Sequence, residues 1–133
     1  MSTVFVNGCF DLLHIGHVRL LQFAKRFGDR LVIGLNSDSS VRSLKGQGRP
    51  IIPESERLQM LYAVGANDVV VFNEPTPFEL VVVRRPDVLV VGCHHSPTCR
   101  SCDYVRDYGG QVAQAPAFDE VSTSAIIERI RAT

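Results

Sequence analysis

Residues 8–17 read GCFDLLHIGH, and this decapeptide joins an apolar strand to a helix. The run Val4–Val6 before it has the β-branched composition of a strand. After it, apolar residues recur at helical spacing, at Leu20, Phe23, Ala24 and Phe27. A strand that passes through a glycine-bearing loop into a helix is the opening unit of a parallel α/β sheet.

The rest of the chain repeats this alternation of strand and helix. Further strands are expected at Leu31–Leu35, Val69–Phe72, Asp87–Val91 and Gln111–Gln114, with helical patterns between them. Most of these runs are almost wholly apolar, so both faces of the sheet should be covered. We therefore predict an α/β protein, a Rossmann-like three-layer sandwich around a five-stranded parallel sheet. Residues 1–133 are expected to form a single domain. Ligands bind such sheets beyond the carboxyl ends of the strands, where the loops after the first and fourth strands should meet.

Composition narrows the classes of function. The 133 residues carry 14 basic and 14 acidic side chains, so the formal net charge is zero. A protein that binds nucleic acid or a membrane surface through bulk charge would carry a basic excess. No apolar run approaches the ~18–20 residues that span a bilayer. Asn7 and Gly8 interrupt the first apolar run, which excludes a secretory signal. We expect a cytoplasmic protein that binds neither nucleic acid nor membrane, with cysteines that are thiols or metal ligands rather than disulfides.

The decapeptide has the chemistry of a phosphate site. A helix N-terminus presents free N–H groups and a partial positive charge. Gly8 and Gly16 leave room for a phosphate close to the backbone. His14 and His17 add two donors, which suit stabilising charge on a phosphate rather than forming a covalent intermediate. The ordinary structural alternative makes the two histidines a loop residue and a helix cap.

The decapeptide resembles the signature of the cytidylyltransferase-like nucleotidyltransferases. Its last four residues, HIGH, are also the signature of class I aminoacyl-tRNA synthetases in the same wider superfamily, but the chain shows no second synthetase signature. Further segments look like one branch, the adenylyltransferase domain that makes ADP-heptose from a heptose 1-phosphate. These segments are Leu31–Pro50, Arg57, Asp68–Pro77, Pro86–Gly92 and Val121–Ser124.

This resemblance implies the nucleotidyltransferase fold and a reaction. A nucleoside triphosphate reacts with a small phosphorylated acceptor such as a sugar 1-phosphate and releases pyrophosphate, with AMP favoured as the group transferred. The acceptor phosphate attacks the α-phosphorus in line, so catalysis consists of positioning and charge neutralisation. Mg²⁺ would bridge the phosphates, mostly through water and the substrate itself. A homodimer is also implied.

The resemblance further implies the site residues. His14, His17 and Lys45 would be catalytic, and Asp38 would contact the acceptor. Asp38 also fits the cap of a helix, as does Ser122. The nucleotide would be bound by Gly8, Cys9, Phe10, Asp11, Gly16, Arg57, Gly92, Ser122 and Thr123.

The chain departs from the family after the fourth strand. Where the family text resembles Lys-Gly-Gly-Asp-Tyr, residues 91–95 read VGCHH. That strand end helps to frame the nucleotide and the acceptor, so the base and the acceptor stay open. The loop also contains cysteines and histidines, the residue types that bind structural Zn²⁺. The candidate ligands are Cys93, His95, Cys99 and Cys102. The alternatives are semi-buried structural cysteines, or a redox pair at Cys99 and Cys102.

Other functions therefore stand beside adenylyl transfer to a sugar phosphate. One is CTP-dependent cytidylyl transfer to glycerol 3-phosphate or another alcohol phosphate or phosphonate. Another is adenylylation of FMN. The third is a non-catalytic nucleotide- or zinc-sensing module. This reading is favoured by Val91, which stands where the family has a lysine. An enzyme is favoured by five intact residues, namely His14, His17, Lys45, Arg57 and Ser122.

Overall fold

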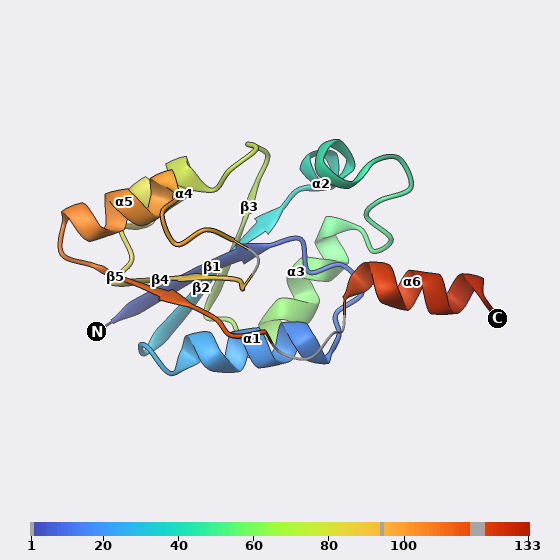
Figure 1. The fold of residues 1–133 in the computed structure, drawn as a ribbon, viewed down its shortest axis with the longest axis horizontal. Helices are drawn as coiled ribbons and strands as arrows, with labels where there is room; N and C mark the ends of the chain where they lie inside the picture. Colours follow the sequence, from blue (N-terminus) through green and yellow to red (C-terminus); the bar gives the residue numbers. More distant parts are fainter. Residues whose placement is uncertain (1, 94, 118–121) are drawn as a thin grey trace.

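The computed structural model describes residues 2–93, 95–117 and 122–133. Five strands form one sheet in the order β3-β2-β1-β4-β5, and every neighbouring pair is parallel (Figure 1). The strands are β1 (Thr3–Gly8), β2 (Arg30–Asn36), β3 (Asp68–Phe72), β4 (Val88–Val91) and β5 (Gln111–Gln114). The predicted five-stranded parallel sheet is confirmed, with each strand within two residues of the run expected for it.

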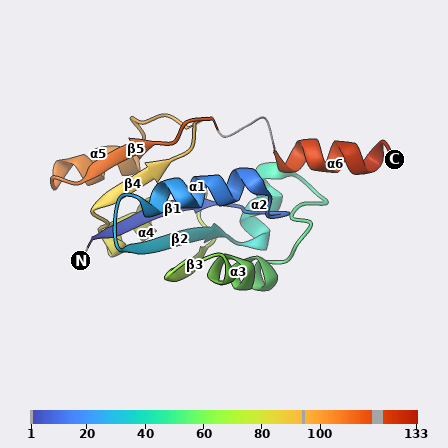
Figure 2. The same ribbon diagram turned by 90° about the horizontal axis from the view of Figure 1, so that it is seen from below.

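Helices connect the strands and flank the sheet. Those in the described part of the chain are α1 (Ile15–Lys25), α2 (Asp38–Lys45), α3 (Glu54–Ala63), α4 (Phe78–Arg84), α5 (Arg100–Asp107) and α6 (Thr123–Arg131). Helix α6 projects from the body of the domain in both views (Figures 1 and 2), and none of its residues is buried. Within the described ranges, no helix has the length and apolarity that crossing a membrane requires.

Side chains of each strand alternate between two buried clusters. Val4 and Val6 of β1 belong to a cluster that includes residues of α1 and α3. Phe5, between them, belongs to a second cluster that includes residues of α4 and α5. Because successive side chains of a strand point to opposite faces, the two clusters lie on opposite sides of the sheet. The helices therefore form two layers around the strands, and the predicted three-layer sandwich is confirmed.

The centre of the sheet fixes where a ligand binds. Strand β1 lies between β2 and β4. After β1 the chain adds β2 and β3 on one side of it, and then adds β4 and β5 on the other side. Such a reversal of strand order opens a crevice beyond the carboxyl ends of the strands. Because β1 and β4 are parallel neighbours, the loops that follow them leave the sheet at the same edge, which is where we expect a ligand.

Candidate active site

His14 and His17 close the N-terminus of α1 through a reciprocal pair of hydrogen bonds. The Gly16 N–H donates to Nδ1 of His14 at 3.1 Å, and the His14 N–H donates to Nδ1 of His17 at 3.2 Å. The two rings stack with their centroids 3.7 Å apart. Capping uses only one nitrogen of each ring, so the helix-cap role and the phosphate role are compatible.

The same contacts set the protonation state of both rings. Burial lowers the pKa of His17 to about 4, and the neighbouring His14 acts in the same direction. Burial also lowers the pKa of His14. Both imidazoles are therefore neutral at pH 7. Nδ1 of each ring accepts a hydrogen bond from a backbone N–H, so Nδ1 is unprotonated. The single proton of each neutral imidazole is therefore assigned to Nε2. Each ring thus presents an Nε2–H that a phosphate oxygen can accept.

The loop between β1 and α1 is held in an unusual backbone conformation. Phe10 and Leu12 have φ angles of 49° and 51°, in the left-handed region. Non-glycine residues there cost about 1 kcal/mol each, so surrounding contacts must enforce them. Phe10 is 4% exposed and packs edge-on against His17, with the ring centroids 5.3 Å apart. A Cβ on Gly8 would approach the same phenyl ring to 3.0 Å. Phe10 thus positions His17 from the core, and Gly8 makes room for Phe10.

Asp11 fastens two further segments to this loop. Its carboxylate, which is 3% exposed, accepts the N–H of Ile51 at 2.7 Å and that of Ile52 at 2.9 Å. Its carbonyl accepts the hydroxyl of Thr123 at 2.8 Å. Both carboxylate oxygens already have a backbone partner, so Asp11 holds the site together where the sequence predicted a nucleotide contact.

Arg57 lies beneath the site rather than facing it. The side chain is 1% exposed, and its Nη1 donates to the carbonyls of Cys9 at 2.7 Å and Asn36 at 2.9 Å. Nε donates to the Ile52 carbonyl at 2.8 Å, and Nη2 donates to Oδ1 of Asp38 at 2.8 Å. The buried guanidinium thus has a structural role in this structure, with three carbonyls and Asp38 as its partners, and the nucleotide contact expected of Arg57 stays a prediction.

Asp38 joins the starts of α2 and α3. Besides Arg57, its Oδ1 accepts the Glu54 N–H at 2.9 Å, and its own N–H donates to Oε1 of Glu54 at 2.9 Å. The Asp38 side chain is 32% exposed. The acceptor contact expected of Asp38 stays a prediction.

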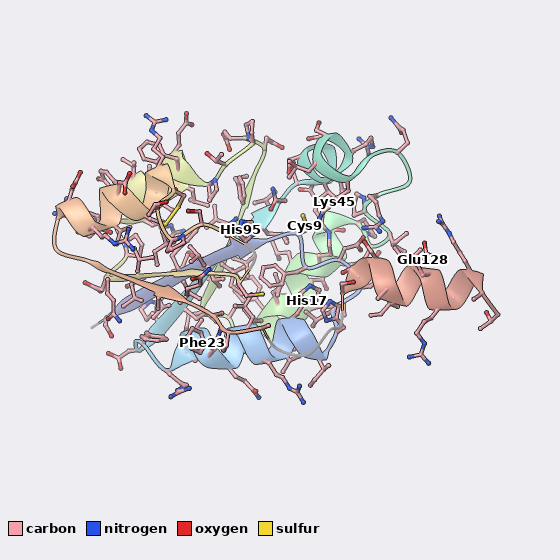
Figure 3. The ribbon with its side chains drawn as sticks, viewed as in Figure 1. Cys9, His17, Phe23, Lys45, His95 and Glu128 are labelled. Atoms are coloured by element: carbon pink, nitrogen blue, oxygen red, sulfur yellow. A yellow bond between two sulfur atoms is a disulfide. The ribbon has the colours of Figure 1, made fainter. Side chains whose placement is uncertain are left out.

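Lys45 and Arg49 bring positive charge to the end of β1. Burial raises the pKa of the Cys9 thiol, while the charges of Lys45, Arg57 and Arg49 act to lower it. Figure 3 shows Lys45 and Cys9 at the same end of the sheet as His17. Lys45 is exposed and is the last residue of α2. Arg49 is a residue that the sequence reasoning missed. The sequence did contain a signal for Arg49, because it is a second cation four residues after Lys45 in the same glycine-bearing loop.

Helix α6 brings a second helix N-terminus to the same place. Ser122 is its N-cap, and the Ser122 hydroxyl accepts the Ala125 N–H at 3.0 Å. The bond from Thr123 to the Asp11 carbonyl holds this first turn beside the β1–α1 loop. The structure thus brings Ser122 and Thr123 to the site. Val121, the first residue of that resembling segment, lies outside the described residues.

The loop after β4 reaches the site from the other side of β1. The His95 N–H donates to the Gly92 carbonyl at 3.1 Å, and Nε2 of Gln114 donates to the His95 carbonyl at 2.9 Å. His95 is exposed and lies on the same side of the molecule as Cys9 (Figure 3). This arrangement places Gly92 and His95 at the strand end where the chain departs from the family text.

Two of the four candidate zinc ligands, Cys99 and Cys102, are paired with each other in this structure, and zinc binding stays a prediction. Cys99 is the N-cap of α5 and is joined to Cys102 as a disulfide, whereas Cys9 and Cys93 are free. This pairing corrects the expectation that all four cysteines are thiols or metal ligands, and it is the pairing of the redox alternative. Sulfurs that share a disulfide are not available as thiolate ligands. In the described ranges, which leave out His94, no three His, Cys, Asp or Glu side chains lie where they would hold a metal ion.

Comparison with known proteins shows the family and agrees with the fold. Residues 5–129 match the family model described as cytidylyltransferase-like. The bifunctional protein HldE of Syntrophotalea carbinolica is 54% identical over 131 residues, which are 97% of this chain and 27% of that protein. The bifunctional protein HldE of Koribacter versatilis is 49% identical over 128 residues, which are 95% of this chain and 26% of that protein. This chain therefore spans about a quarter of the length of these curated relatives.

A solved structure supports the fold independently. The lipopolysaccharide core biosynthesis protein from Thermoplasma volcanium aligns with a TM-score of 0.75 and 24% identity, over 90% of this chain and 99% of that chain. This likeness shows the fold, a parallel α/β sheet with helices on both faces. The chain belongs to the cytidylyltransferase-like family and is a nucleotidyltransferase. The resemblance stated from the decapeptide is confirmed.

Proposed function

We propose that this domain transfers AMP from ATP to a sugar 1-phosphate of the heptose class and releases pyrophosphate. The observation that carries the proposal is the pair of neutral imidazoles at the start of α1, each with an Nε2–H directed by a backbone bond on Nδ1. The choice of AMP and heptose rests on the branch that the sequence resembles and on the HldE relatives.

The reaction asks little covalent chemistry of the protein. An oxygen of the acceptor phosphate attacks the α-phosphorus, the new P–O bond forms, the bond to the β-phosphate oxygen breaks, and pyrophosphate leaves with that electron pair. Negative charge grows on the oxygens around the α-phosphorus as this happens. In this proposal the Nε2–H groups of His14 and His17 donate to those oxygens, and preorganised donors of this kind are worth about 3 kcal/mol each in the transition state.

Charge neutralisation completes the proposed mechanism. Lys45 supplies a flexible ammonium from the end of α2 to the β- and γ-phosphates. When bound, Mg²⁺ neutralises further phosphate charge, and the donor set around the decapeptide fits an ion held mainly by phosphate oxygens and water. Asp11 illustrates that fit, because both its carboxylate oxygens are occupied by backbone N–H groups.

The segment after β4 is the part of the site that leaves the base of the nucleotide and the acceptor undecided. Residues 91–95 carry histidines where the family text has an acidic and an aromatic residue. Cytidylyl transfer to glycerol 3-phosphate and adenylyl transfer to FMN are therefore the alternatives that the first assay must contain. The homodimer stays a prediction, which multi-angle light scattering tests.

The test is pyrophosphate release in the presence of Mg²⁺. ATP and CTP are crossed with heptose 1-phosphate, other sugar 1-phosphates, glycerol 3-phosphate, a phosphonate and FMN. Turnover with ATP and heptose 1-phosphate at the highest kcat/KM supports the proposal. A higher kcat/KM for CTP, or for another acceptor, would replace it. The matched background control is His17→Ala, which removes the proposed donor.

A further inference from the structure

Cys99 and Cys102 occupy different environments at the start of α5. Cys99 is the N-cap and is partly exposed, whereas Cys102 lies in the first turn and is fully buried in the core cluster of that face. Their sulfurs are joined as a disulfide. A thiol from outside the protein can therefore reach Sγ of Cys99 but not Sγ of Cys102. The C-x-x-C spacing is itself typical of redox-active pairs.

The structure also provides hydrogen-bond partners for the reduced form of both cysteines. The Cys102 N–H donates to Sγ of Cys99 at 3.2 Å, and a helix N-terminus favours negative charge, so a thiolate at Cys99 is stabilised. Sγ of Cys102 lies 3.8 Å from the carbonyl oxygen of Ser96. A disulfide sulfur has no proton to donate to this oxygen, whereas a thiol has one. Both sulfurs therefore have a partner when the bond is reduced.

The loop after β4 is anchored to the elements around this pair. Nη1 of Arg106, in α5, donates to the Pro97 carbonyl at 2.7 Å. Nε2 of Gln114, in β5, donates to the His95 carbonyl at 2.9 Å. The loop ends at Cys99, where α5 begins. A displacement of Cys99 therefore passes directly into the loop that carries His95.

Reduction of the bond should displace Cys99 rather than Cys102. Two unbonded sulfurs lie farther apart than two bonded ones, so breaking the bond requires at least one of them to move. Cys102 is packed in a buried cluster with Leu89 of β4 and Val105 of α5, and such clusters resist displacement. Cys99 is only partly buried and adjoins the exposed residues of the loop. The loop after β4 therefore takes up the change.

We propose that Cys99 and Cys102 are a redox-active pair that undergoes thiol–disulfide exchange with a dithiol, and that the state of this pair controls the freedom of the loop after β4. The inference goes beyond nucleotidyl transfer, because exchange at Cys99 needs neither nucleotide nor acceptor. It adds a reactive site on the segment where the chain departs from the family text.

The exchange takes place in two steps. A thiolate of the dithiol attacks Sγ of Cys99, a mixed disulfide forms, and the bond to Cys102 breaks. The electron pair of that bond goes to Sγ of Cys102, which takes up a proton. The second thiolate of the dithiol then attacks the dithiol sulfur bound to Cys99, which leaves as a thiolate. The dithiol is oxidised to a disulfide, and its two electrons remain on the cysteine pair.

The first experiment measures exchange in the full, native chain. The protein is treated with dithiothreitol, with a zinc chelator present so that the freed thiols do not take up metal. Iodoacetamide then labels the free thiols, and peptide mass spectrometry identifies them. We expect reduction of the pair without denaturant and re-formation of the bond with oxidised glutathione. Reduction that requires denaturant would show a purely structural disulfide and would overturn the proposal.

Variants assign the roles of the two sulfurs. Cys99 in Cys102→Ala should be labelled at least about tenfold faster than Cys102 in Cys99→Ala, because labelling follows thiolate character and exposure. Equal rates would overturn the assignment. Cys93→Ser removes a free thiol of the same loop and is the matched control, which should leave exchange of the pair unchanged. Loss of exchange in Cys93→Ser would identify Cys93 as the reactive thiol and would also overturn it.

The second experiment compares amide hydrogen exchange of the oxidised and reduced protein. Peptides from the loop after β4 should exchange on the order of tenfold faster after reduction, because the crosslink restricts local opening. Peptides from α3, which packs on the other face of the sheet, should stay within about twofold. An equal rise in α3, or no rise in the loop, would refute control of the loop by the pair. Neither experiment uses substrate, so a failed acceptor assay would reject only the proposed function.

Discussion

Replacing Arg57 by methionine separates a structural role for this residue from a phosphate-binding one. Methionine keeps an unbranched side chain of comparable length but removes every donor. The carbonyls of Cys9, Asn36 and Ile52 lose their partner, and the carboxylate of Asp38 loses its ion pair. Removing one member of a buried, hydrogen-bonded ion pair costs about 3–5 kcal/mol. Domains of this size have total stabilities of about 5–15 kcal/mol.

The assay for Arg57→Met is urea unfolding of the free protein, followed by far-UV circular dichroism. We expect the free energy of unfolding to fall by about 3–5 kcal/mol and the melting temperature to fall by about 10–15 °C. Arg42→Met is the matched control, because Arg42 is exposed and its replacement should change stability by less than about 0.5 kcal/mol. If Arg57→Met unfolds at the wild-type urea concentration while its KM for ATP rises, Arg57 faces the ligand and the structural assignment is refuted.

Three further predictions follow from the same geometry. His17→Ala should lower kcat by about 100- to 1000-fold with little change in the far-UV spectrum, because it removes a donor to the α-phosphate; a loss under threefold in a steady-state pyrophosphate assay would contradict that role. Because the pKa of folded His17 is lowered to about 4, the unfolded chain binds more protons between pH 6.5 and pH 4, so stability should decrease on the order of 3 kcal/mol as the pH falls through that window; His17→Gln should flatten urea midpoints over the same range, and an equally steep profile would count against the assignment. Reducing the bond between Cys99 and Cys102 with a phosphine should cost about 2 kcal/mol, from the entropy of a four-residue loop; an unchanged melting temperature would show that the bond does not stabilise α5.

The strands and the histidine motif were predictable because their signals are local. The burial of a run such as Leu31–Leu35 follows from its apolar composition alone, and β2 forms around that run. His14 and His17 stand three residues apart at the start of a helix, so their mutual contacts depend only on the geometry of one turn. The periodicity of a few residues was enough to locate both.

The roles of the buried polar residues were not predictable, because they depend on distant segments. Asp11 bonds residues 40 and 41 positions away, and Arg57 bonds a carbonyl 48 positions away. Nothing in the composition around either residue reports such partners. Asp11 lies within the decapeptide and arginine is a residue type that binds phosphate, so both residues were included in the predicted nucleotide site.

The expectation that the cysteines are thiols or metal ligands was wrong for Cys99 and Cys102, for a different reason. It rested on the cellular compartment, whereas the structure distinguishes the cysteines by position and forms the pair that the redox alternative named. Cys99 caps α5 and Cys102 lies in its first turn, with the two Cα atoms 5.0 Å apart. That separation lies within the range of about 4.4–6.8 Å that a disulfide requires. The onset of a helix three residues before Cys102 was the missing information.

The polar residues of the site thus fall into two layers, and the division explains how a neutral pair of histidines serves a charged ligand. Asp11, Arg57 and Asp38 are paired with backbone groups or with each other, and they hold the loops in place. Above them, the two histidines lie at the start of α1, and Lys45 and Arg49, which pair with no carboxylate in the described ranges, lie at the end of α2 and in the loop that follows. In the proposed mechanism, cations beside the leaving group and neutral donors at the reacting phosphorus would favour separation of charge toward pyrophosphate. The Arg57→Met variant addresses the lower layer alone, because its buried partners are backbone carbonyls and Asp38. A loss of stability without a selective loss of pyrophosphate binding is expected of it.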